Sequence, residues 1–298
     1  MSTLALRTSL LVDARDARAL NAACNSTADA VIIDLASPAA YADRANARRS
    51  ANRAAEAFAS AGRIVFARVS DARSGATEGD IQSIVRANLA AVVLAGTVEP
   101  QDSRAVDVAI RKQEMRRSIE PGTVRLIADI DSAAGLRLLP AIIEAIDRHS
   151  AVVLDVTALA RDLGLLGAAT AHFNTLEHAM SELALTCTAA GIVWLLAAPG
   201  IDAGARAALA TSAHAHGAAG VVVASDAEAQ GFNRLFTPDP ETVATARLVA
   251  AEWDALRKRG DESSVVAGHI VDRRTKNAAR AVISRAEAIA VREKVAVR

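Results

Sequence analysis

The chain has few aromatic residues and no excess of charge of either sign. Phenylalanine, tyrosine and tryptophan make up 3% of its 298 residues, whereas apolar residues as a whole make up 52%. The interior must therefore be built mainly from Ala, Val, Leu and Ile. Thirty-four basic residues balance thirty-four acidic ones, so there is no electrostatic reason to expect nucleic acid or an anionic membrane as a partner.

Cysteine and long apolar runs are also scarce. Cys24 and Cys187, the only two cysteines, lie far apart without metal-ligand spacing, which favours a reducing compartment. No apolar run approaches the roughly 20 residues that a membrane helix requires. The opening residues lack a basic leader followed by a cleavage site, and they predict a first strand instead. We therefore expect a soluble, cytoplasmic protein.

What the sequence does contain is an alternation of short apolar runs and helix-length segments rich in alanine and arginine. Eight such runs, bounded by polar residues, are typical of parallel strands buried on both faces. They cover residues 3–12, 30–35, 63–69, 91–95, 124–130, 151–155, 191–196 and 219–224. Predicted helices between them include residues 43–61, 101–118, 133–149 and 175–190. This alternation predicts a (β/α)8 TIM barrel rather than a doubly wound sheet, and no GxGxxG follows the first strand.

The chain continues beyond the eighth predicted strand. "FTPDPETV" (236–243) has prolines at turn and first-helical positions, which predicts a helix from Pro240 to about Arg259. A Gly/Asp/Ser loop and a further helical segment follow. We therefore expect a barrel over residues 1–235 and a C-terminal helical extension or lid over residues 236–298. Such a piece covers a barrel mouth or docks on a neighbouring subunit, and the sequence does not decide between these.

Charged residues gather at the ends of the predicted strands, where (β/α)8 barrels build their active sites. In "LIADIDSAAG" (126–135), Asp129 and Asp131 project to one side, because alternate side chains of a strand share a face. Several carboxylates beside one arginine suit Mg²⁺ and an anionic substrate that pairs with Arg68. The plainer alternative is that each aspartate caps a helix or starts a turn. The charged strand-end residues are Asp13, Asp34, Arg68, Asp71, Asp129, Asp131 and Asp155.

Motifs along nearly the whole chain resemble those of one family. "RTSLLVDA" (7–14) resembles "RSLLFVPG", "DAVIIDLASPA" (29–39) resembles "DAVILDLEDAV", and "ARVS" (67–70) resembles "VRVN". "DIDSAAGL" (129–136) resembles "LIETAAGL", "LDVTALARDLG" (154–164) resembles "FGAEDLAADLG", and "LFTPDPETVATAR" (235–247) resembles "AFSPSPEEVAWAR". Taken together, these motifs resemble the citrate lyase beta-subunit and malyl-CoA lyase group of the HpcH/HpaI aldolase superfamily.

The resemblance implies a function, an assembly and a site. The family cleaves carbon–carbon bonds reversibly in hydroxyacyl- or ketoacid-type substrates, often CoA thioesters, with the help of Mg²⁺, and a homo-oligomer such as a trimer is implied. The metal and a third-strand arginine place positive charge where the negative charge of an enolate grows. Arg68 matches that arginine, and Arg7 matches a first-strand arginine for an anionic substrate group. Asp34 survives from a cluster that supports water or catalysis.

The departures from the family pattern fall on the metal site. Asp131 replaces the metal-binding Glu, and Ala158 replaces the ligand Asp, so one carboxylate is missing. Asp155, three positions earlier, is the obvious substitute, and Asp129 is a second. One hypothesis is a carbon–carbon lyase with a displaced Mg²⁺ site at Asp131 and Asp155. The other is a non-catalytic protein that binds an organic acid or acyl-CoA, or a regulatory subunit.

Overall fold

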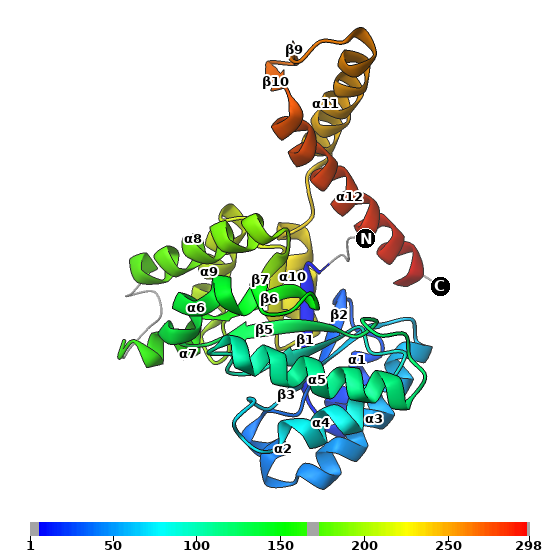
Figure 1. Ribbon diagram of the computed structural model, residues 1–298, viewed down its shortest axis with the longest axis vertical. Coiled ribbons are helices and arrows are strands. Elements are labelled where there is room, and N and C mark those ends of the chain that lie inside the picture. The colour runs from blue at the N-terminus through cyan, green and yellow to red at the C-terminus, as the bar shows by residue number, and fades with distance from the viewer. Residues whose placement is uncertain (1–5, 166–172, 297–298) are drawn as a thin grey trace. The chain divides into compact units, whose positions relative to one another are not determined.

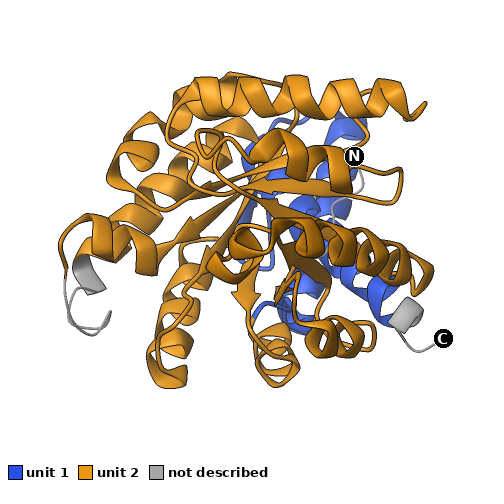
Figure 2. Ribbon diagram, turned by 90° about the horizontal axis from the view of Figure 1, so that it is seen from below, with its two compact units in different colours: residues 1–5, 236–298 blue, residues 6–235 orange. Residues whose placement is uncertain are grey.

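The computed structural model describes residues 6–165 and 173–296. The chain divides into two compact units, one of residues 6–235 and one that includes residues 236–298 (Figure 2). Among the described residues, no helix is both long enough and apolar enough to cross a membrane.

Residues 6–235 form a closed barrel of eight parallel strands, in which each strand pairs with the next and β1 also pairs with β8. The strands are β1 (Thr8–Asp13), β2 (Ala30–Asp34), β3 (Ile64–Val69), β4 (Ala91–Leu94), β5 (Arg125–Ile130), β6 (His149–Asp155), β7 (Val193–Ala197) and β8 (Gly220–Val223). The helices are α1 (Ala17–Ala23), α2 (Pro38–Ala42), α3 (Arg44–Ser60), α4 (Thr77–Ile84), α5 (Pro100–Arg116), α6 (Ala133–Glu144), α7 (Val156–Asp162), α8 (Phe173–Ala190), α9 (Ala203–Ala215) and α10 (Asp226–Leu235). The predicted (β/α)8 barrel is confirmed.

The interior of the barrel is aliphatic, as the shortage of aromatic residues requires. Phe66 on β3 is the one large ring in a cluster that is otherwise made of Ala, Ile, Leu and Val from the strands. The strands lie inside a ring of helices (Figure 2), so both faces of the sheet are covered and the strands need no polar side. This explains why each strand appears in the sequence as a continuous apolar run.

Two sequence predictions differ from the structure at their ends. The first strand begins at Thr8 rather than at residue 3, and residues 3–5 lie outside the described residues. The helix predicted over 133–149 ends at Glu144, and His149 already belongs to β6. Arg148, between this helix and β6, is buried, and its guanidinium donates to both carboxylate oxygens of Glu114 at 2.9 and 3.0 Å.

The barrel closes at a seam between β1 and β8, where Thr8 stands opposite Val221. Gly220 opens β8 at this seam. A Cβ atom at this position would overlap the backbone carbonyl groups of Leu6 and Arg7, so a side chain has no room there. Glycine is therefore required for the last strand to reach the first.

The unit that includes residues 236–298 contains α11 (Pro240–Arg259), β9 (Ser264–Val266), β10 (His269–Val271) and α12 (Arg273–Ala296). Figure 1 shows α11 and α12 packed side by side, with the two short antiparallel strands joining them. The predicted start of α11 is correct, since Asp239 caps it and Pro240 takes its first position. Gly260 ends α11 in a left-handed conformation. The β9–β10 hairpin was not predicted, because its strands have only three residues each.

Candidate functional site

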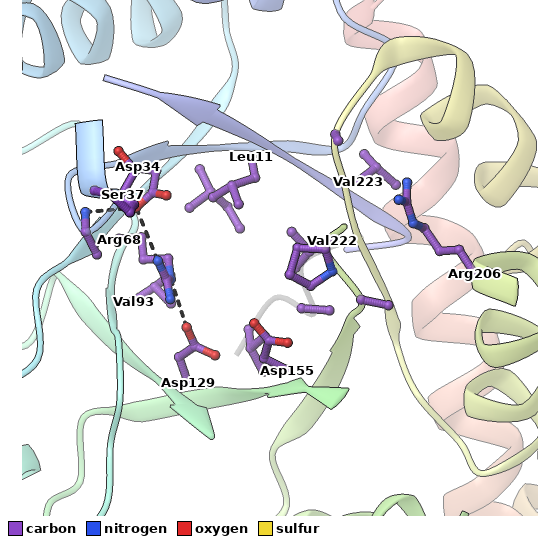
Figure 3. A pocket seen from close by; sticks show the side chains of 18 of the residues that line it. Leu11, Asp34, Ser37, Arg68, Val93, Asp129, Asp155, Arg206, Val222 and Val223 are labelled. Atoms are coloured by element: carbon purple, nitrogen blue, oxygen red, sulfur yellow. Dashed lines mark hydrogen bonds and ion pairs between the residues drawn. The ribbon is translucent and has the colours of Figure 1, made fainter. Parts of the chain in front are cut away.

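A cavity of about 470 Å³, the mouth cavity, opens at the carboxyl ends of the barrel strands. Figure 3 shows apolar side chains such as Leu11, Val93 and Val222 around it, together with a small number of charged groups. This composition, mostly apolar with a few converging polar groups, is typical of a site for a small molecule. The charged residues that line it are Asp34, Arg68, Asp129, Asp155, Arg161 and Arg206.

Arg68 is held between two aspartates from different strands. Its Nε donates to Oδ2 of Asp129 at 2.8 Å, and its Nη1 donates to Oδ1 of Asp34 at 3.4 Å. Arg68 stands directly opposite Asp34 in the register of β2 and β3, whereas Asp129 lies beyond β4 on β5. Burial works against the charge, but Asp129 and Asp34 outweigh it and raise the pKa of Arg68 further. The predicted site residues Arg68 and Asp34 are therefore brought together.

Asp34 ends β2 and is almost fully buried. Its Oδ1 also accepts a hydrogen bond from the backbone N–H of Ala36 at 2.9 Å, which shapes the turn after the strand. Burial raises the pKa of Asp34, although Arg68 and the Ala36 N–H partly oppose this. Asp34 thus serves both as a turn residue and as a partner of Arg68, which combines the two interpretations of a strand-end aspartate.

Asp129 is the second partner of Arg68, and it has an oxygen to spare. Its side chain is 4% exposed. Oδ2 accepts from Arg68, but Oδ1 is buried without a hydrogen-bond partner in the structure. The sequence indicated that Asp129 faces the same side as Asp131, but its pairing with Arg68 depends on the barrel's closure across β4.

Asp155 lies at the cavity and also caps a helix. It ends β6, and its Oδ1 accepts from the backbone N–H groups of Thr157 and Ala158 at 3.0 and 2.9 Å, which caps α7. Figure 3 shows Asp155 on the same wall as Asp129. Burial, followed by the charge of Asp129, raises the pKa of Asp155 to about 6.

Asp131 faces a neighbouring cavity of about 370 Å³, which it lines together with Asp71 and Arg73. Asp131 follows Ile130, which pairs with Leu154 just before Asp155, so the two aspartates leave adjacent strands at the same level. Their side chains nevertheless line different cavities. Burial, followed by the charge of Asp129, raises the pKa of Asp131 as well. Within residues 6–165 and 173–296, no group of three or more His, Cys, Asp or Glu side chains could hold a metal ion.

Arg7 lies at the other end of the barrel. It precedes β1, and its partner Asp29 precedes β2, so both are at the amino ends of the strands. The Arg7 Nε donates to Oδ2 of Asp29 at 3.0 Å, and its Nη2 donates to Oδ1 at 2.9 Å. The structure therefore does not place Arg7 among the residues that line the mouth cavity.

Two arginines of the cavity were not identified from the sequence. Arg206, on α9, lies across the cavity from Arg68 (Figure 3); it is ion-paired with Glu228 and donates to the carbonyl oxygen of Ile201 at 2.8 Å. Arg161 lies on α7 and donates through Nε to the carbonyl oxygen of Thr157 at 3.4 Å. The position of Arg161, six residues after the strand-end Asp155, is the one signal that could have placed it near the mouth.

Fold and site together define a (β/α)8 barrel of the kind that binds a small molecule at the carboxyl ends of its strands. The profile of the HpcH/HpaI aldolase/citrate lyase family matches residues 7–226. The chain belongs to this family, which confirms the resemblance found in the sequence motifs. A curated relative, a (3S)-malyl-CoA thioesterase from Cereibacter sphaeroides, is 27% identical over 291 residues, with 95% of each chain covered.

Solved structures support the fold. A citrate lyase from Burkholderia xenovorans aligns with a TM-score of 0.72 at 16% identity, covering 96% of this chain and 92% of its own. CitE from Mycobacterium tuberculosis, in complex with magnesium, acetoacetate and coenzyme A, aligns with a TM-score of 0.66 at 21% identity, covering 95% and 98%. These neighbours share the fold.

Proposed function

We propose that the mouth cavity binds a small organic acid, free or as a CoA thioester, and that the chain is a carbon–carbon lyase of its family. The observation that carries this proposal is the Arg68 guanidinium, held by Asp34 and Asp129 beside a largely apolar cavity at the carboxyl ends of the strands. The (3S)-malyl-CoA thioesterase relative, and the CitE neighbour in complex with acetoacetate and coenzyme A, support this substrate class.

Cleavage of a carbon–carbon bond of this kind requires a fixed positive charge beside the substrate. When a carbon–carbon bond next to a carbonyl group breaks, its electron pair passes to that carbonyl and forms an enolate. The two aspartates hold the Arg68 guanidinium in place before the substrate arrives, so no reorganisation is needed as the charge develops. The apolar wall around it excludes water and strengthens this interaction.

The family resemblance and the magnesium-bound neighbours suggest Mg²⁺ for this reaction. The residues present do not fit a shared ion: Asp131 and Asp155 line two neighbouring cavities that share Arg68, and among the described residues no group of three or more His, Cys, Asp or Glu side chains could hold a metal. The displaced site at Asp131 and Asp155 stays a prediction.

A second candidate function is non-catalytic binding of an organic acid or acyl-CoA. Ala158 favours it, since this methyl group stands where the family has a carboxylate and its backbone N–H is taken by Asp155. A homo-oligomer such as a trimer, in the cytoplasm, stays a prediction under both functions. Light scattering of the purified protein tests the assembly.

The two functions are separated by calorimetric titration of the metal-stripped protein with oxaloacetate, with and without Mn²⁺ in place of Mg²⁺. We expect saturable oxaloacetate binding without metal, and an affinity roughly 30-fold lower in Arg68→Met. Binding without any cleavage of malyl-CoA or a related thioester favours the non-catalytic function. Saturable Mn²⁺ binding that Asp131→Asn and Asp155→Asn each abolish supports the displaced metal site instead. Absence of oxaloacetate binding under all conditions contradicts the proposed function.

A further inference from the structure

Asp129 carries a buried acceptor that the described residues leave unused. The residue is 3% exposed and lines the mouth cavity. Its Oδ2 is fixed by Arg68, and its Oδ1 has no hydrogen-bond partner. A buried carboxylate oxygen without a donor is costly, because it has lost water and gained nothing in return. Such a group in a cavity indicates that the cavity's occupant supplies the donor.

Among the described residues, none donates a hydrogen bond to the free oxygen of Asp129. In the register of the sheet, Asp129 stands opposite Val153, and both line the cavity. Val93 also lines the cavity; it lies on β4, the strand between Arg68 on β3 and Asp129 on β5. Asp155 lies on the same wall (Figure 3), and its Oδ1 already accepts from backbone N–H groups. This part of the cavity wall therefore consists of apolar side chains and a second carboxylate.

We propose that Asp129 is a substrate-binding residue, whose free oxygen accepts a hydrogen bond from a hydroxyl or ammonium group of the bound acid. This inference rests on the proposed function, since it assumes that an organic acid occupies the cavity. It assigns a role to a residue that the family pattern leaves apolar. It also predicts that acids with a hydrogen-bond donor bind more tightly than acids of the same length without one.

The geometry further restricts where the donor must be. Arg68 uses Nε and Nη1 on the two aspartates, which leaves Nη2 for the carboxylate of the acid. The two oxygens of Asp129 belong to one carboxylate, so the free oxygen lies beside the guanidinium that the acid contacts. The donor must therefore be attached close to that carboxylate, on the first or second carbon from it. The substrate class is a 2- or 3-substituted short-chain acid.

Three acids with the same four-carbon skeleton test the inference: succinate, malate and aspartate. Each is titrated calorimetrically into metal-stripped protein, so that contacts through a metal do not contribute. We expect malate or aspartate to bind at least about 10-fold more tightly than succinate, as a hydrogen bond to a charged acceptor requires. Tighter malate binding identifies a hydroxyl as the donor, and tighter aspartate binding identifies an ammonium.

Asp129→Asn is the matched variant. Its amide oxygen can remain on Arg68 while its amide nitrogen takes the place of the free acceptor, so we expect the preference over succinate to fall below about 3-fold. Asp147→Asn is the control: it makes the same chemical change at an exposed position before β6, at the opposite end of the barrel. We expect it to keep the full preference.

The outcomes are distinct. Equal affinities of the three acids for the wild-type protein overturn the role of Asp129 while leaving the proposed function intact. A preference that survives Asp129→Asn, in protein whose thermal unfolding shows that it is folded, overturns it as well. No binding of any of the three acids contradicts the proposed function itself and the inference with it. Equal affinities in the wild-type protein overturn the role of Asp129 even if the variant fails to fold.

Discussion

Each end of the barrel carries an ion pair between an arginine and an aspartate. The two pairs differ in their exposure and in how many of their polar atoms have a hydrogen-bond partner. At the amino ends of the strands, the Arg7 and Asp29 side chains are 5% and 1% exposed, and Asp29 also accepts from the backbone N–H of Arg7. At the carboxyl ends, Arg68 is 22% exposed, and among the described residues none donates to Oδ1 of Asp129. The Arg7–Asp29 pair is therefore the closed pair, and the Arg68–Asp129 pair is the incomplete pair.

The difference indicates that one pair contributes to the stability of the barrel, whereas the other is available to bind a ligand. A closed pair has every polar atom satisfied by the chain, so it can only hold the strands together. An incomplete pair, beside a cavity, has bonding capacity that a ligand can complete. The presence of an arginine at a strand end therefore does not indicate its role. The number of polar atoms without a partner around it does indicate that role.

Breaking the closed pair should have the largest effect on stability. Arg7→Met leaves the Asp29 carboxylate buried without its counter-charge, and we expect the free energy of unfolding to fall by about 3–5 kcal/mol. Urea unfolding measures this change. Oxaloacetate binding by the folded fraction should be unchanged, because Arg7 does not line the mouth cavity. A loss of binding affinity equal to that of Arg68→Met would contradict the comparison.

Breaking the incomplete pair should affect binding more than stability. Arg68→Met removes the cation beside the cavity, and we expect the affinity for oxaloacetate to fall by about 2 kcal/mol, roughly 30-fold. The free energy of unfolding should fall less than in Arg7→Met, because Arg68 is partly exposed. Calorimetry and urea unfolding of the two variants, side by side, give both quantities. Arg68→Lys should recover only part of the affinity, since its single ammonium lacks the planar fork of arginine.

The pH dependence of stability should report on Asp155. Burial raises its pKa to about 6, above the unfolded value of about 3.9. The folded state therefore holds this proton more tightly, and the stabilising contribution is present below pH 4 and lost as the pH rises through 6. Asp155→Asn removes this dependence but keeps a side chain that can cap α7. The quantity to compare is the free energy of unfolding of the variant minus that of the wild type. We expect this difference to be about 1–2 kcal/mol more positive at pH 8 than at pH 4.5.

The comparison with the variant is needed because other groups titrate in the same range. Burial also raises the pKa values of Asp34 and Asp131, whereas it lowers the pKa of His149 to about 4. The contribution of His149 has the opposite sign, since it is present above pH 6.5 and is lost as the pH falls through 4. Urea unfolding in buffer with a chelator, for both proteins at both pH values, isolates Asp155. A constant difference between them would contradict its raised pKa.

An exposed ion pair should have the smallest effect. Lys112 and Glu78 are 2.8 Å apart, but their side chains are 46% and 68% exposed. Water solvates both charges, so we expect Lys112→Met to leave the urea midpoint unchanged within error. This variant serves as a control for Arg7→Met, because it removes a charge of the same sign without leaving a buried partner. A loss comparable to that of Arg7→Met would show that burial is not what distinguishes the pairs.

The fold could be predicted from the sequence because each strand is apolar on both faces and each helix is bounded by local signals. The side-chain partners could not, because they depend on closure of the barrel. Arg68 and Asp129 belong to strands separated by β4. Asp131 and Asp155 leave adjacent strands at one level but face different cavities. Motifs identified the family and the missing carboxylate at Ala158, whereas the unused oxygen of Asp129 required coordinates.

The seam between β1 and β8 has a consequence for synthesis. A chain leaves the ribosome from its amino end, so β1 is made first, whereas the strand that covers its open edge begins only at Gly220. Until then, the growing sheet has two unpaired edges, each a template for pairing with another chain. A product truncated before Gly220 therefore cannot close its barrel, however well its earlier strands have formed. Long-lived truncated chains should aggregate through these edges, whereas chains that extend past residue 223 should not.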